Sequence, residues 1–209
     1  MKVIVFGAHG SVGEHVVSKL LKNGYTSCAV AGNENQIDLL KKRGASEVVI
    51  YEERLLPTLF EGCEAAIYLT GISLKGPSGR TVMVDHQSVI ETVKEAERQG
   101  VKRFVMMSAV TANEAVGDES REIAAKEMPD ELLRQSKLTY TVVQPGMLTD
   151  KPGNGKISAS VTLDSPELEI PREDLAEVLV QSLETEATFN KTFEVAEGDM
   201  TISKALDSL

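Results

Sequence analysis

Three glycines in the stretch GAHGSVG, residues 7–13, have the spacing of a turn that binds phosphate. An apolar run precedes them and an amphipathic run follows, so the turn would join a strand to a helix. The first turn of such a helix directs backbone N–H groups and partial positive charge at an anion. The pattern predicts that a dinucleotide is held at Gly7, His9, Gly10, Ser11, Val12 and Gly13. The alternatives are a packing turn that binds nothing and, for His9, a side chain that faces solvent.

Each glycine has a different role in a turn of this kind. Gly7 would permit the tight bend, and Gly10 would let a ligand approach the backbone closely. Gly13 would let the helix pack tightly on the strand.

The end of the second predicted strand bears on which dinucleotide is bound. An acidic residue there would bind the ribose hydroxyls of NAD, whereas an arginine would bind the 2′-phosphate of NADP. The strand runs out as CAVAGNENQ, which offers Gly32 and Asn33 at this place. The sequence therefore predicts cofactor contacts at these two residues and leaves the choice between NAD and NADP open.

The elements that must position these residues alternate along the chain. Near-continuous apolar runs predict buried strands, and apolar residues three or four apart predict helices between them. The predicted strands are Lys2–Phe6, Thr26–Val30, Glu47–Ile50, Ala65–Leu69, Arg103–Met107 and Tyr140–Gln144. The predicted helices are Ser11–Asn23, Glu34–Arg43, Leu55–Phe60, Gly79–Gln99 and Ser120–Ser136. This alternation predicts a three-layer α/β fold with a doubly wound, mostly parallel sheet between helices.

The pattern changes after the last of these strands. A turn-rich stretch, KPGNGKIS, precedes a predicted helix whose first turn contains Pro171, Glu173 and Asp174, as a helix N-terminus prefers. A late strand, KTFEVA, and a short helix, TISKALDSL, follow. We expect a single domain over the whole chain, with a core at 1–146. The C-terminal extension at 147–209 is expected to cover the carboxyl ends of the strands, where ligands bind in such sheets.

The composition argues against several classes of partner. Acidic residues outnumber basic ones by 32 to 22, and the resulting net charge of −10 repels nucleic-acid phosphates and anionic membranes. Only 4% of the residues are aromatic, so bases have little to stack on. The first apolar run is too short for a signal peptide or a membrane span, and no group of residues has metal-ligand spacing. We therefore expect a cytoplasmic protein that binds no nucleic acid, membrane or metal.

Later blocks of the sequence carry a family resemblance. They are GVKRFVMMSA, the pair Ala125–Lys126, LTYTVVQPGMLTD and KTFEVAEGDMTISKAL. With the glycine turn, they resemble atypical short-chain dehydrogenases/reductases of the NAD-dependent epimerase/dehydratase superfamily, and most of all the small NmrA-like and biliverdin/flavin-reductase-like proteins. The resemblance implies a Rossmann fold with NAD or NADP across the glycine turn. It also implies that the cofactor lies along Thr70 and Gly71 and that its nicotinamide lies near Pro145, Gly146, Met147 and Leu148.

The same resemblance bears on catalysis. Such reductases commonly use a serine after the fifth strand and a tyrosine four residues before a lysine, whose ammonium lowers the pKa of the phenol and holds the ribose. Ser108 and Lys126 match the serine and the lysine, but Glu122 stands where the tyrosine is expected. Glu122 either replaces the phenol as a carboxyl with a raised pKa or forms an ordinary i, i+4 pair with Lys126. The resemblance thus implies Ser108 and Lys126 as catalytic residues, with Lys126 also a cofactor ligand.

Two functions remain open. One is an NAD(P)H-dependent reductase of a small-molecule acceptor that works without the usual tyrosine. The other is a non-catalytic NAD(P)-binding sensor or regulator of the NmrA-like kind, which would act on a protein partner. A sugar epimerase or dehydratase fits less well, because those reactions rely on the missing tyrosine.

Overall fold

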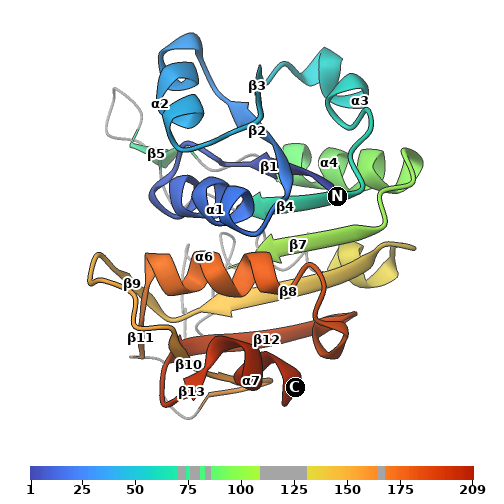
Figure 1. The fold of residues 1–209 in the computed structure, drawn as a ribbon. Helices are drawn as coiled ribbons and strands as arrows, with labels where there is room; N and C mark the ends of the chain where they lie inside the picture. The colour runs from blue at the N-terminus through green and yellow to red at the C-terminus, as the bar shows by residue number, and fades with distance from the viewer. Residues whose placement is uncertain (70–73, 76–80, 83–85, 109–130, 164–167) are drawn as a thin grey trace.

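The computed structural model of the chain describes residues 1–69, 74–75, 81–82, 86–108, 131–163 and 168–209. Among these residues, nine strands form one sheet in the order β13-β10-β12-β8-β7-β4-β1-β2-β3 (Figure 1). The strands are β1 (Lys2–Phe6), β2 (Thr26–Ala31), β3 (Glu47–Ile50), β4 (Ala65–Leu69), β7 (Arg103–Met107), β8 (Thr139–Pro145), β10 (Lys156–Ser160), β12 (Lys191–Glu197) and β13 (Met200–Thr201).

The strands from β3 to β12 run parallel, and β10 pairs antiparallel with β12. Because β1 pairs with both β2 and β4, the direction in which the chain adds strands reverses at β1. Sheets of this kind bind ligands in the crevice at the carboxyl ends of the strands beside such a reversal.

Helices cover both faces of the sheet. One face carries α1 (Ser11–Lys22), α2 (Ile37–Lys42), α6 (Arg172–Gln181) and α7 (Ile202–Asp207), and the other carries α3 (Leu56–Leu59) and α4 (His86–Arg98) (Figure 1). Three 3-10 turns are η1 (Glu34–Gln36), η2 (Glu53–Leu55) and η3 (Glu186–Thr188). Two small strand pairs lie outside the main sheet: β5 (Leu74–Lys75) with β6 (Thr81–Val82), and β9 (Met147–Thr149) with β11 (Glu169–Pro171).

The side chains of β1 show how the sheet is buried on both faces. Val3 and Val5 belong to the core under α1 and α6, whereas Ile4 and Phe6 belong to the core under α3 and α4. All four side chains are buried. A strand that is apolar at every position therefore fits only a sheet with helices on both sides, as the sequence predicts.

The predicted α/β class, the mostly parallel sheet and the three layers are confirmed. Strands β1, β3, β4 and β7 have the predicted bounds, while β2 and β8 are slightly longer. Most of the predicted helix Ser120–Ser136 lies outside the described residues.

The predicted helix Leu55–Phe60 is confirmed as the single turn α3. Two details of the prediction are wrong. Thr81–Val82, expected in a helix, forms strand β6, because these β-branched residues favour extended backbone, and α4 begins at His86. The C-terminal extension adds β10 and β13 to the sheet besides the predicted β12. Pairing with β10 satisfies backbone groups that an exposed β12 edge would leave open.

Candidate functional site

The glycine turn leaves β1 and enters α1 with each glycine in a distinct environment. Gly7 has a φ of +77°, and a Cβ there would lie 2.8 Å from the carbonyl oxygen of Leu69. A Cβ on Gly13 would lie 2.3 Å from the carbonyl oxygen of Gly7. Among the described residues, a Cβ on Gly10 would approach only that same oxygen, at 3.3 Å. The fold therefore requires Gly7 and Gly13, whereas Gly10 keeps a space free in front of α1.

The N-terminus of α1 opens onto this space. Gly10 is the N-cap residue and makes no side-chain capping hydrogen bond. The first N–H groups of an α-helix have no intrahelical acceptor, so those that follow Gly10 are available to a ligand. Glu14, in the first turn, is paired with Arg43 at 2.7 Å rather than free to repel an anion. These features fit the pyrophosphate of a dinucleotide.

His9 lies inside the turn and is only partly accessible to solvent. Its Nδ1 atom is buried without a hydrogen-bond partner among the described residues. Burial lowers the pKa of the imidazole below its usual 6.5. The ring is therefore neutral at pH 7 and carries an unpaired polar atom, which distinguishes it from an ordinary surface histidine.

The loop after β2 is held by its own side chains. The N–H of Gly32 donates to Oε1 of Gln36 at 2.7 Å, and Oδ1 of Asn33 accepts from the N–H of Asn35 at 3.1 Å. Gly32 and Asn33 are exposed. Gln36 was not singled out from the sequence; its position four residues after Gly32 is the signal for this local bond. Cofactor contacts at Gly32 and Asn33 stay a prediction.

Ser108 and the end of β8 lie at the same edge of the sheet as the glycine turn. Ser108 directly follows β7, is buried, and donates its N–H to the carbonyl oxygen of Val143 at 2.9 Å. Gly146 donates its N–H to Val195, and a Cβ there would lie 2.0 Å from the carbonyl oxygen of Leu168. Only a glycine therefore fits between the end of β8 and the chain before β11.

The residues around Gly146 differ in exposure. Pro145 is buried and Leu148 is half-buried, whereas Met147 is 55% exposed. The structure thus brings Ser108 and Pro145–Leu148 to the edge that also carries the glycine turn. Thr70, Gly71, Glu122 and Lys126 lie outside the described residues.

The C-terminal extension contributes a residue that was not predicted from the sequence. Nε of Arg172, the first residue of α6, donates to Oγ of Ser11 at 3.0 Å. Its Nη1 donates to Oδ1 of Asp150 at 2.8 Å. A signal was available, because a basic residue in the first turn of a helix opposes the helix dipole.

Asp174 lies in the first turn of α6, as predicted, and has a further role there. It is 3% exposed, and its carboxylate accepts the N–H groups of Asn154 and Gly155 at 2.9 and 3.0 Å. The acid therefore fastens the turn before β10 to α6. Lys19 of α1 pairs with Glu177 of α6 at 3.0 Å and so helps to hold these two helices together.

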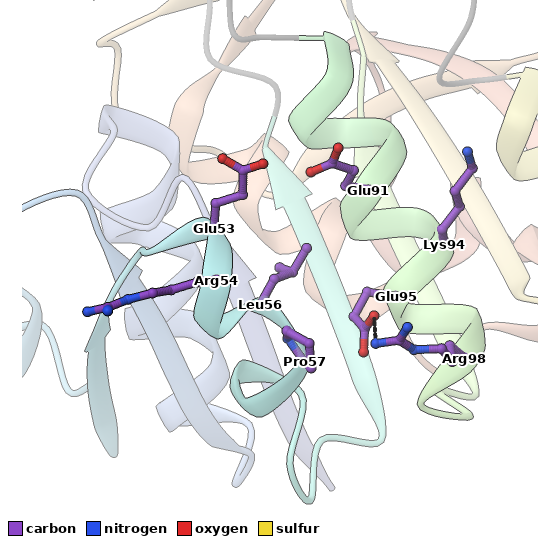
Figure 2. Close-up of a pocket in the computed structure, with 8 residues that line it drawn as sticks. All are labelled: Glu53, Arg54, Leu56, Pro57, Glu91, Lys94, Glu95 and Arg98. Carbon is purple, nitrogen blue, oxygen red and sulfur yellow. Dashed lines mark ion pairs between the residues drawn. The ribbon is translucent and has the colours of Figure 1, made fainter.

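A separate cavity of about 550 Å³ opens between η2, α3 and α4, on the face away from α1 (Figure 2). Its lining residues are Glu53, Arg54, Leu56, Pro57, Glu91, Lys94, Glu95 and Arg98. Glu95 and Arg98, one turn apart on α4, pair with each other at 2.6 Å. None of these residues belongs to the predicted site, so the cavity is a poor candidate for the cofactor.

Metal and membrane sites were also sought in the part of the chain that the structure describes. There, no group of three or more histidine, cysteine, aspartate or glutamate side chains could hold a metal ion. None of the helices in the same ranges is both long enough and apolar enough to cross a membrane.

The geometry agrees with comparisons to known proteins. The model of a family described as NAD(P)H-binding matches residues 7–186, from the glycine turn to the start of η3. The chain belongs to this NAD(P)H-binding family. The predicted dinucleotide cofactor and the family resemblance are thereby confirmed, and the choice between NAD and NADP stays open.

Three proteins illustrate the similarity. The uncharacterized sugar epimerase YhfK of Bacillus subtilis is 33% identical, with 100% of both chains covered. A solved structure from Bacillus halodurans, provisionally assigned as an NAD-dependent epimerase/dehydratase, is 32% identical with a TM-score of 0.90 over 100% of both chains. The anaerobilin reductase ChuY of Escherichia coli O157:H7 is 17% identical with a TM-score of 0.76 over 96% of this chain and 99% of that one, a similarity of fold.

Proposed function

We propose that the protein is an NAD(P)H-dependent reductase of a small acceptor molecule. The observation that carries the proposal is the space that the described residues leave at Gly10, in front of the α1 N-terminus, whose N-cap residue makes no side-chain capping bond. Ser108 and the end of β8 share the sheet edge with this space. Cofactor and acceptor would therefore lie side by side along the carboxyl ends of β1, β4, β7 and β8.

Different residues would contact different parts of the cofactor. The N–H groups at the start of α1 bind the pyrophosphate, and Gly32 and Asn33 contact the ribose of the adenosine. Pro145, Gly146, Met147 and Leu148 flank the nicotinamide. When bound, the reduced nicotinamide supplies a hydride to the acceptor.

Ser108 would stabilise the acceptor while it is reduced. Its hydroxyl donates a hydrogen bond to the acceptor atom that gains negative charge, and the proton finally comes from solvent. Lys126 is proposed as a ligand of the ribose. The assignment of the acceptor as a small molecule draws support from ChuY, whose name describes a reductase of this fold.

Titration of the protein with NADPH and with NADH, followed by addition of a flavin and a quinone, tests this function. We expect binding of one cofactor or both, seen in cofactor fluorescence, and then loss of absorbance at the reduced nicotinamide when an acceptor is added. Binding without oxidation by any acceptor would contradict a reductase and favour the sensor, whose support is the glutamate at position 122 in place of the tyrosine.

Ser108→Ala refines the test. Loss of one hydrogen bond in the transition state should lower kcat roughly 10-fold, since such bonds contribute about 1.4 kcal/mol. The dissociation constant of the cofactor should not change. Ser208→Ala, at the far C-terminus of α7, is the matched control and should leave kcat unaltered. An unchanged kcat in Ser108→Ala would remove this serine from the chemistry.

The names of YhfK and of the Bacillus halodurans protein suggest epimerisation as a second candidate. A nicotinamide-dependent epimerase oxidises and re-reduces its sugar, so it retains its cofactor and consumes none. Incubation with nucleotide sugars, followed by separation of the epimers, would detect it. Interconversion of sugars without net oxidation of NAD(P)H would replace the reductase proposal.

A further inference from the structure

We propose that Arg172 of the C-terminal extension binds the cofactor pyrophosphate jointly with the N-terminus of α1, and that Asp150 holds the guanidinium when no pyrophosphate is there. This inference rests on the proposed function only in that the glycine turn binds a dinucleotide. It assigns to the extension a direct part in that binding.

The contact between two helix N-termini is the first observation. Arg172 begins α6 and Ser11 begins α1, and Nε of Arg172 donates to Oγ of Ser11 at 3.0 Å although 161 positions separate the two residues. Packing of α6 against α1, strengthened by the Lys19–Glu177 pair, brings the two ends together. The guanidinium therefore lies directly beside the N–H groups that face a pyrophosphate.

The second observation is that the Arg172 side chain is largely buried while its ion-pair partner is exposed. The side chain of Arg172 is 21% exposed, so it is largely fixed, whereas the side chain of its partner Asp150 is 91% exposed. Among the described residues, the acceptors of the guanidinium are Ser11 and Asp150. An ion pair with so exposed a carboxylate is readily exchanged for another anion.

Arg172 contributes little to the stability of the fold at this position. A cation in the first turn of α6 opposes the helix dipole, and an exposed ion pair with Asp150 contributes little stability. A planar guanidinium, by contrast, matches the oxygens of a phosphate and can bind two of them at once.

Charge supplies the third observation. The backbone N–H groups of the glycine turn are neutral dipoles, and the chain as a whole carries a net charge of −10. A pyrophosphate that approaches this protein is repelled at long range. Arg172 places a full positive charge at the turn itself, while Arg43 neutralises Glu14 in the same turn of α1.

The test measures dissociation constants for NADH and for ADP-ribose, which has the pyrophosphate but lacks the nicotinamide. Arg172→Ala should weaken the binding of both about 10-fold, the size expected for a charge-assisted bond to phosphate. Asp150→Asn should strengthen both about 2- to 5-fold, because it removes the competing carboxylate. Arg98→Ala, which removes an ion-paired arginine from α4 on the opposite face, is the matched control and should change neither.

The opposite signs distinguish ligand binding from a structural ion pair. Weaker binding in both Arg172→Ala and Asp150→Asn would mean that the pair only supports the fold, and equal affinity in all variants would also overturn the inference. A loss confined to the KM of the acceptor, with ADP-ribose unaffected, would assign Arg172 to the acceptor instead. If the wild-type protein bound none of NADH, NADPH and ADP-ribose, the cofactor site itself would be refuted. Asp150→Asn keeps the test decisive even where Arg172→Ala lowers stability.

Discussion

One arginine lies at the amino-terminal ends of the parallel strands (the amino edge) and another at their carboxyl ends (the carboxyl edge). The two arginines differ in burial and in hydrogen-bond partners. Arg103, the first residue of β7 at the amino edge, is 4% exposed, and its guanidinium lies 4.4 Å from the centre of the Phe189 ring. It donates to four acceptors on β8, at the end of α6 and in η3: Thr139, Thr141, Ser182 and Thr188. Burial lowers the pKa of Arg103 to about 9, so it stays charged at pH 7.

The carboxyl edge is built with open positions instead. Arg172 has an exposed and replaceable partner, while among the described residues Nδ1 of His9 has none and a space is left at Gly10. One helix joins the two edges, since α6 begins with Arg172 and its C-cap residue Ser182 accepts from Arg103. The difference teaches that the hydrogen bonds of Arg103 at the amino edge stabilise the fold, whereas we propose that the open positions at the carboxyl edge serve a ligand.

Gly13→Ala should have the largest effect and tests whether part of the carboxyl edge also serves the fold. The new Cβ would lie 2.3 Å from the carbonyl oxygen of Gly7 and 2.6 Å from backbone atoms of Ala8, which cannot move as a side chain can. We expect a loss of at least about 3 kcal/mol, which lowers Tm by about 6–12 °C in a chain of this size.

Gly10→Ala is the matched control for that variant. Its Cβ meets one oxygen at 3.3 Å, so Tm should stay within about 2 °C of the wild type. Similar Tm values for the two variants, measured by thermal unfolding, would contradict the division between Gly13 and Gly10.

Arg103→Met should have the next largest effect and tests the amino edge. Methionine retains much of the apolar packing but removes the guanidinium donor from the carbonyl groups of Thr139 and Ser182. We expect a loss of about 2 kcal/mol, and hence a Tm lower by about 4–8 °C. The dissociation constant of NADPH, measured well below Tm, should not change.

The control is Arg98→Met, because the side chain of Arg98 is 67% exposed and its ion pair should contribute less than about 1 kcal/mol. Weaker NADPH binding in Arg103→Met than in this control would show that the amino edge is not purely structural.

His9→Gln should have the smallest effect, which is a change in how Tm depends on pH. Burial lowers its pKa in the folded protein, whereas in the unfolded chain it keeps the usual value of about 6.5. The unfolded state therefore binds more protons in the window just below pH 6.5, so this histidine makes stability rise with pH and fall on acidification. Between pH 7 and pH 5, His9→Gln should lose about 1 °C less in Tm than the wild type. An identical or larger fall in His9→Gln would show that the buried ring does not carry this penalty.

Local patterns allowed much of the fold to be predicted. The apolar runs of β1, β4 and β7 predicted their bounds, because these strands are buried on both faces and bordered by helix-period sequence. The edge strand β3 is only partly buried, but its apolar run also predicted its bounds. The glycine turn was likewise predictable, since its three roles depend on residues close in sequence. β10 and β13 were missed, because β10 becomes a strand by pairing with β12, and β13 by pairing with β10.

The site was predictable only in part for the same reason. The contact between Arg172 and Ser11 depends on how α6 packs on α1, and the sequence gives no direct sign of a contact over 161 positions. The burial of Asp174 likewise depends on a turn that folds back onto α6. Contacts that depend on tertiary packing rather than on local spacing are therefore the ones that could not be predicted from the sequence.

The most direct test of the account compares NADPH and NADH binding by the wild type and by Gly10→Val. Thr201→Val, at the N-cap of α7, where the side chain also makes no capping bond, is the matched control. We predict that Gly10→Val weakens binding by at least about 100-fold, because its side chain fills the space meant for the pyrophosphate, while its Tm stays close to that of the control. Undiminished affinity in Gly10→Val would contradict the central claim that the glycine turn holds the cofactor.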